Sequence, residues 1–170
     1  MSFTDREVWG LIHGMVLGAV FLLAFAGGLA DLYGLRTALV TGTGVVERMR
    51  RLKIGVTAMA VAAWGTVITG TWVVYPWYRE KVPNSPRSQL LADPDTADWH
   101  EFGMEWKEHI AWISPILATV VAFIVLYYGK TLIRHERVRR TTMLLFVLAF
   151  AFAAIAGAFG ALITKVAPVE

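Results

Sequence analysis

The stretch that decides the fold is TTMLLFVLAFAFAAIAGAFGALIT, residues 141–164, in which 24 consecutive residues include no Asp, Glu, Lys or Arg. Three further runs without these residues cover 8–30, 54–78 and 109–129. Each run has at least 21 residues, and a helix needs roughly 20 to cross a bilayer core. A soluble helix would carry charged residues on its solvent face. The sequence therefore predicts an all-α integral membrane protein, a single domain (1–170) built as a bundle of four transmembrane helices.

The composition agrees with a membrane protein. Hydrophobic residues make up 56% of the chain and charged residues 17%, whereas about 25% of the residues in soluble domains are charged. The first apolar run is not expected to be a cleaved signal, since Met1–Glu7 lacks a basic leader and the run is longer than a signal core. The chain has no cysteine, which excludes disulfides, thiolate metal sites, iron–sulfur clusters and covalently attached c-type haem.

The charges outside the apolar runs predict the orientation in the membrane. Residues 31–53 contain five Lys or Arg and two acids, and residues 130–140 contain five and one. Residues 79–108 contain four Lys or Arg and seven acids. Because positive loops stay in the cytoplasm, both termini and the acidic loop are predicted to lie outside, as in a multi-pass protein of a bacterial-type inner membrane. The positive residues gather beside the apolar runs, so the net charge of +3 does not indicate a nucleic-acid partner.

The acidic loop 79–108 is the largest segment outside the predicted spans. Prolines at its start argue against a helix around 83–86. From about 96 to 108 no helix breaker occurs, which predicts a juxtamembrane helix that continues into the third span. Pro115 is predicted to kink that helix near the membrane surface.

Two of the predicted spans contain a histidine, and ionisable residues inside a membrane are costly and often functional. His13 lies near the start of the first span and His109 begins the third. Both spans enter from the outer side, and at about 1.5 Å per residue the two imidazoles come to similar depths in the outer leaflet. Two histidines on separate helices at one depth can ligate a haem iron from its two faces. Gly10 and Gly14 beside His13 leave room for a flat ring.

With these features the chain resembles the small four-helix cytochrome b subunits that anchor respiratory enzymes and exchange electrons with quinones. The resemblance covers the architecture and the pair His13 and His109. It implies one haem b in a membrane-anchored electron-transfer subunit that links the quinone pool to a partner on the outer face. Such a subunit works inside a larger complex, with other subunits and lipid as its partners, and is not a stand-alone enzyme.

Charged residues of the outer loop are candidates for supporting roles at that site. Arg79 and Arg87 are predicted to meet the haem propionates, which point toward water. Glu105 and Glu108 are predicted to relay protons from a quinol, because carboxylates at a membrane surface can do so.

Two other interpretations remain open from the sequence. The protein is a haem-free structural or assembly subunit if His109 is only interfacial and His13 only bonds to a neighbouring helix, with Thr69, Thr71 or Tyr75 as partners. Alternatively, Glu105 and His109, four residues apart on one helical face, belong to a zinc, iron or manganese site on the outer loop.

Overall fold

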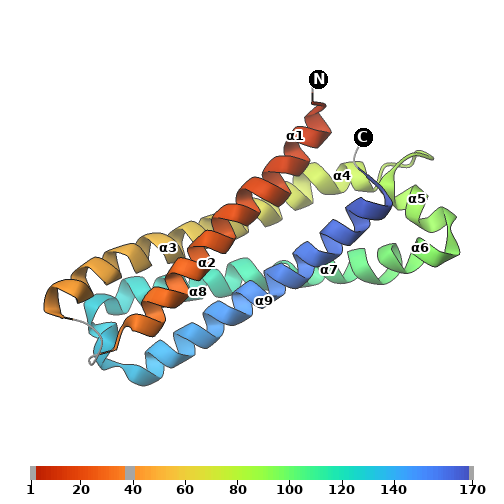
Figure 1. The fold of residues 1–170 in the computed structure, drawn as a ribbon. Helices are drawn as coiled ribbons and strands as arrows, with labels where there is room; N and C mark the ends of the chain where they lie inside the picture. Colours follow the sequence, from red (N-terminus) through yellow and green to blue (C-terminus); the bar gives the residue numbers. More distant parts are fainter. Residues whose placement is uncertain (1–2, 37–40, 169–170) are drawn as a thin grey trace.

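The computed structural model describes residues 3–36 and 41–168, and every regular element in these ranges is a helix. Four of the helices are long and apolar enough to cross a membrane: Asp5–Gly34, Gly42–Tyr78, Pro94–Arg134 and Glu136–Val166. We call them the first to fourth long helices. They lie side by side along one axis (Figure 1). This confirms the predicted all-α fold with four helices able to span a membrane.

The first two long helices each consist of several elements. The first is composed of α1 (Asp5–Leu11), η1 (Ile12–Val16) and α2 (Leu17–Gly34), and the second of α3 (Gly42–Thr69), η2 (Gly70–Val74) and α4 (Tyr75–Tyr78). Each begins at a threonine whose hydroxyl accepts a hydrogen bond from a backbone amide of the first turn. At Thr4 the side chain of Glu7 returns a bond to the backbone, which completes a capping box.

The outer loop adds a short helix that the sequence did not predict, α5 (Pro86–Ala92). Proline is compatible with the first position of a helix, where no amide hydrogen is needed, and Ser85 caps the turn. The third long helix then runs through α6 (Pro94–Asp98), η3 (Trp99–Met104), α7 (Glu105–Ile110), α8 (Ile113–Tyr128) and η4 (Gly129–Arg134).

A short interruption at residues 111–112 separates α7 from α8. It precedes Pro115, which has no amide hydrogen to bond to the carbonyl of Ala111. Gly129, at φ 49°, ends α8, and the left-handed region it occupies favours glycine. The fourth long helix is the single element α9 (Glu136–Val166).

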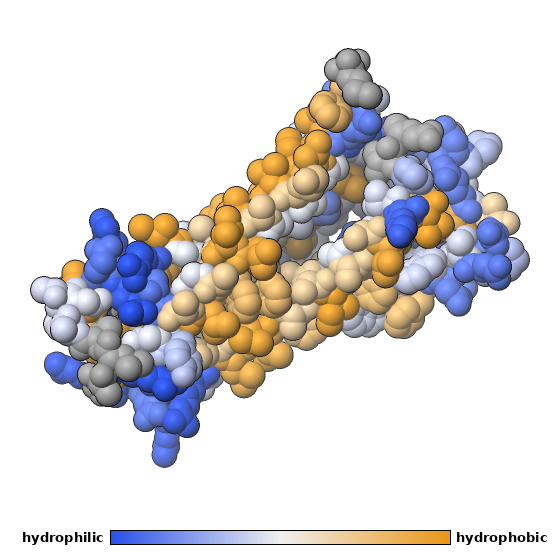
Figure 2. All heavy atoms as spheres, viewed as in Figure 1, coloured by the Kyte–Doolittle hydropathy of each residue, from blue (hydrophilic) through white to orange (hydrophobic). Residues whose placement is uncertain are grey.

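The order of the helices around the bundle places the first and third diagonally. The first packs on the second and fourth, and the third packs on the same two. Both ends of the described chain lie at the same end of the bundle as α4, α5 and α6 (Figure 1). We call this the outer end. An apolar belt separates the hydrophilic residues of the two ends (Figure 2).

Packing differs strongly between the two halves of the bundle. The main hydrophobic core lies in the inner half, around Leu32, Leu52, Val121 and Phe146, none of which has any exposed surface. A second, smaller cluster around Tyr78 closes the outer end. In the apolar 18-residue stretch of the first long helix only 6% of the residues are buried, against 39% in that of the second. The first long helix is therefore the least packed, and the bundle is hollow between the two clusters.

Candidate functional site

A cavity of about 1400 Å³ occupies the outer half of the bundle and is lined by all four long helices. Its walls are mostly apolar, with Phe21, Val67 and Phe150 toward the inner core. His13 and His109, the two histidines predicted from the sequence, both line it. The space-filling view shows a hollow between the first long helix and the rest of the bundle (Figure 2). Small-molecule sites usually measure roughly 300–1,000 Å³, so this cavity can admit a large ligand.

Three π-helical turns border the cavity, one in each of the first three long helices. They are η1, η2 and η3, and each contributes at least one residue to the lining. A π-turn widens the helix locally and is often found at functional sites. The His13 ring lies against Gly70 at the start of η2, where a Cβ atom would come within 2.8 Å of Cε1 of the imidazole. The close approach of these two helices therefore depends on glycine at position 70.

His13 is held through its ring nitrogen Nδ1. Its Nδ1 lies 3.1 Å from Oγ1 of Thr69, and that hydroxyl donates its proton to the backbone carbonyl of Gly65 at 2.7 Å. The hydroxyl must then accept from Nδ1–H, which fixes the neutral tautomer with a lone pair on Nε2. The ring also lies within hydrogen-bonding reach of the Thr66 backbone, and Nδ1 is the nitrogen with a side-chain partner among the described residues. Thr69 is one of the partners of His13 that the sequence analysis named. The bond uses Nδ1 and leaves Nε2 available to a metal.

His109, an exposed residue of the diagonal helix, also bonds through Nδ1, but to the backbone of its own helix. Its Nδ1 lies 2.7 Å from the backbone carbonyl of Glu105 on the preceding turn. A carbonyl oxygen only accepts, so Nδ1 carries the proton and Nε2 the lone pair. Histidines that ligate metals commonly donate the other ring N–H to a carbonyl or a similar acceptor, which orients the ring. Both cavity histidines are in this tautomer.

His100 differs, because both of its nitrogens bond to protein groups. Nε2 accepts from Nε of Arg87 at 3.1 Å, and Nδ1 lies 2.8 Å from the hydroxyl of Tyr78. The residue precedes the charge-free segment 109–129 and is buried in the outer loop. Burial lowers the pKa of the His100 imidazole, and the guanidinium of Arg87 lowers it further. His100 therefore fastens the outer loop and has no nitrogen left for a metal.

The two predicted proton-relay carboxylates lie on one face of α7 but in different surroundings. Glu108 lines the cavity and accepts a hydrogen bond from the Tyr75 hydroxyl at 2.8 Å. Its other oxygen, Oε1, is buried without a hydrogen-bond partner and lies 3.7 Å from Nη2 of Arg79. Glu105 is paired with the same Arg79 guanidinium. Arg79 thus bridges both carboxylates, and only Glu108 contacts the cavity.

The two arginines predicted to meet propionates do not line the cavity. Arg79 is engaged with Glu105 and Glu108, and Arg87 donates to His100. Lys165 and Lys107 both line the cavity. The sequence analysis did not single out Lys107. In the sequence it is one lysine within a run of charged residues, and nothing there distinguishes it from a solvated side chain.

The predicted metal site on the outer loop receives no support from the geometry. In residues 3–36 and 41–168 no three His, Asp or Glu side chains come together as metal ligands. Glu105, one of the proposed ligands, is instead paired with Arg79.

Comparison with protein-family models, curated proteins and solved structures finds no match to this chain.

Proposed function

We propose that the protein is a membrane-anchored electron carrier that holds one haem b in the central cavity, with His13 and His109 as axial ligands. The observation that carries this proposal is the pair of imidazoles. They line one cavity from diagonal helices, and in each the Nδ1 proton is bonded to the protein while Nε2 keeps its lone pair. Neutral imidazole nitrogen is a common axial ligand of haem iron.

The walls of the cavity suit a large flat ligand. Gly10 and Gly14 border it beside His13, and a Cβ atom at either position would meet no other atom within 4 Å. Neither glycine therefore obstructs a flat ring that approaches the imidazole. The mostly apolar lining favours a hydrophobic macrocycle and limits the access of water to it.

A bound haem would supply one-electron chemistry at this position, and the residues of the chain would set its properties. The two imidazoles would hold the group, and each is oriented by the hydrogen bond that its Nδ1–H donates, to Oγ1 of Thr69 for His13 and to the Glu105 carbonyl for His109. Glu108 offers a proton-accepting group at the cavity wall. This arrangement supports electron exchange between a membrane quinone pool and a partner at the outer end, within a larger complex.

We further propose that both termini and the acidic loop face the outside of a bacterial-type inner membrane, with lipid around the belt. The charges support this orientation, because the described parts of the basic segments, 31–36, 41–53 and 130–140, begin at the other end of the bundle.

The test is the visible spectrum of protein purified from cells supplied with haem. Wild type should show a Soret band and, after reduction with dithionite, the α band of a b-type cytochrome. His13→Ala and His109→Ala should each lose most of the bound haem. His135→Ala is the matched control, since His135 lies at the opposite end of the bundle, beside Tyr128. A wild-type protein without a Soret band, or a band that survives both cavity substitutions, would refute the proposal and leave the structural-subunit interpretation.

A further inference from the structure

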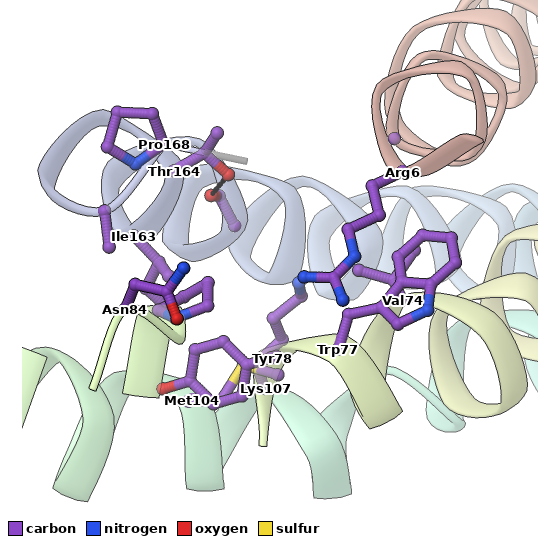
Figure 3. A pocket seen from close by; sticks show the side chains of 14 residues that line it. Arg6, Val74, Trp77, Tyr78, Asn84, Met104, Lys107, Ile163, Thr164 and Pro168 are labelled. Atoms are coloured by element: carbon purple, nitrogen blue, oxygen red, sulfur yellow. Dashed lines mark hydrogen bonds between the residues drawn. The ribbon is translucent and has the colours of Figure 1, made fainter. Parts of the chain in front are cut away.

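A second, smaller chamber of about 100 Å³ lies at the outer end of the bundle. Figure 3 shows the side chains that surround it: Arg6 comes from the first long helix, Asn84 from the outer loop, and Thr164 from the fourth long helix. Lys107 and Gly160 line both this chamber and the central cavity. The two spaces therefore adjoin, and Lys107 lies where they meet.

Lys107 reaches this position because the facing helix has a glycine. A Cβ atom at Gly160 would lie 3.0 Å from Nζ of Lys107 and 3.6 Å from its Cε. The lysine side chain thus lies across the fourth long helix at the outer end of the apolar belt. Any larger residue at position 160 would press on the ammonium group.

The positive charge of Lys107 lacks a partner in the described part of the chain, where no ion pair or hydrogen bond to its ammonium is found. Glu108, the next residue, forms no ion pair with Lys107 among the described residues: its Oε2 accepts from Tyr75, and its Oε1, which has no hydrogen-bond partner, lies 3.7 Å from Nη2 of Arg79. Partly desolvated cations are costly unless an anion or several hydrogen-bond acceptors compensate them. An acidic group on a ligand in the adjoining cavity would compensate this ammonium.

The other cation of the chamber is already compensated. Arg6 pairs with Glu80 at 2.8 Å, and its guanidinium lies 5.8 Å from the centre of the Trp77 ring. The polar groups that remain are Asn84 and Thr164. The chamber thus combines one unbalanced positive charge with uncharged hydrogen-bonding groups, and its volume corresponds to only a few water molecules.

We propose that Lys107 is the counter-ion for an acidic group, a carboxylate or a phosphate, on the molecule whose apolar body fills the central cavity, and that the outer chamber holds this group. The inference rests on the proposed function only in sharing its cavity. If the ligand is haem, the acidic group is a propionate; if it is a lipid that enters between the first and fourth long helices, the group is the headgroup phosphate. In both cases the acid end is directed outward.

The first part of the experiment follows haem in protein purified as Lys107→Met and Lys107→Arg. Loss of a charge-assisted bond weakens binding by about 10- to 100-fold, so Lys107→Met should transfer its haem to apomyoglobin that much faster than wild type. Lys107→Arg should restore most of the retention. Lys81→Met is the control, because Lys81 is exposed and lines neither space. Thermal unfolding of each variant shows whether it is folded.

The second part uses haem-depleted protein in a non-ionic detergent that contains no phosphate, with and without added phosphatidylglycerol. If the acidic group is a lipid phosphate, the anionic lipid raises the unfolding temperature of wild type and of Lys107→Arg, but not of Lys107→Met. That result in a protein that never binds haem supports the role of Lys107 and refutes the haem proposal. In the opposite outcome, haem binding requires His13, Lys107→Met retains haem as well as wild type does, and the lipid has no effect. This outcome overturns the role of Lys107 and leaves the haem proposal intact.

Discussion

Replacing Thr69 by valine tests the orientation of His13 without removing the imidazole. The substitution deletes the hydroxyl that accepts from Nδ1–H of His13 at 3.1 Å. It also removes the bond that this hydroxyl donates to the Gly65 carbonyl, a carbonyl within the same helix. The side chain keeps nearly its shape, so the cavity wall should remain in place.

The expected size of the effect follows from the role of Thr69 as the partner of a ligand. Losing such a partner typically weakens metal affinity by about 10- to 100-fold, which corresponds to about 1.4–2.7 kcal/mol of binding free energy. We expect Thr69→Val to release haem faster by this factor while its Soret band remains. The assay is the rate of haem transfer to apomyoglobin, measured in the same detergent for each variant.

Thr66→Val provides the matched control. Thr66 lies one turn away on the same helix and lines the same cavity, but its hydroxyl donates to the Ala62 carbonyl of its own helix at 2.9 Å. Its removal should leave haem retention near the wild-type value. Equal retention in Thr69→Val and wild type, or equal loss in both valine variants, would refute the assignment of the Nδ1–H tautomer to His13.

Three further predictions concern stability and topology. A Cβ atom in Gly28→Ala would lie 2.8 Å from Cζ of the fully buried Phe146 ring, and this overpacking should lower the free energy of unfolding by about 1–3 kcal/mol in a denaturation series. The pKa of His100 is lowered in the folded protein, so below about pH 6.5 the unfolded chain binds more protons than the folded one. The unfolding temperature should therefore fall on acidification from neutral pH. The fall should be smaller in His100→Phe. The chain has no cysteine, so an impermeant maleimide on intact cells should label Lys81→Cys but not Arg137→Cys, and the reverse pattern would invert the proposed orientation.

The membrane-spanning architecture was predictable because it depends on a property of the sequence alone. A run such as 54–78, which has no charged residue, is unfavourable to expose to water, and its length matches the thickness of a bilayer. The four runs lie within the four long helices of the structure. The helix α5 was missed because proline argues against helix inside an element but is compatible with the first position, and the sequence does not say which applies at Pro86.

The candidate site was only partly predictable, for reasons of geometry. The depth of His13 and His109 followed from residue counting, but that they line one cavity depends on which helices are diagonal. The sequence does not determine that order. Lys107 was missed because its significance arises from a distant glycine, Gly160, on another helix. Likewise, the π-turn η2 places Gly70 against His13, a contact that hydrophobic patterning cannot indicate.

The unequal packing of the two halves also has a mechanical consequence. The inner half is a solid core, while at the outer end the first and fourth long helices diverge (Figure 1). The protein is therefore wedge-shaped and displaces more lipid from one leaflet than from the other. A wedge responds to the lateral pressure of the bilayer, so we expect its unfolding temperature to change when lipids of different spontaneous curvature are placed in the leaflet at the outer end. The membrane itself then becomes part of what holds the first long helix against the bundle.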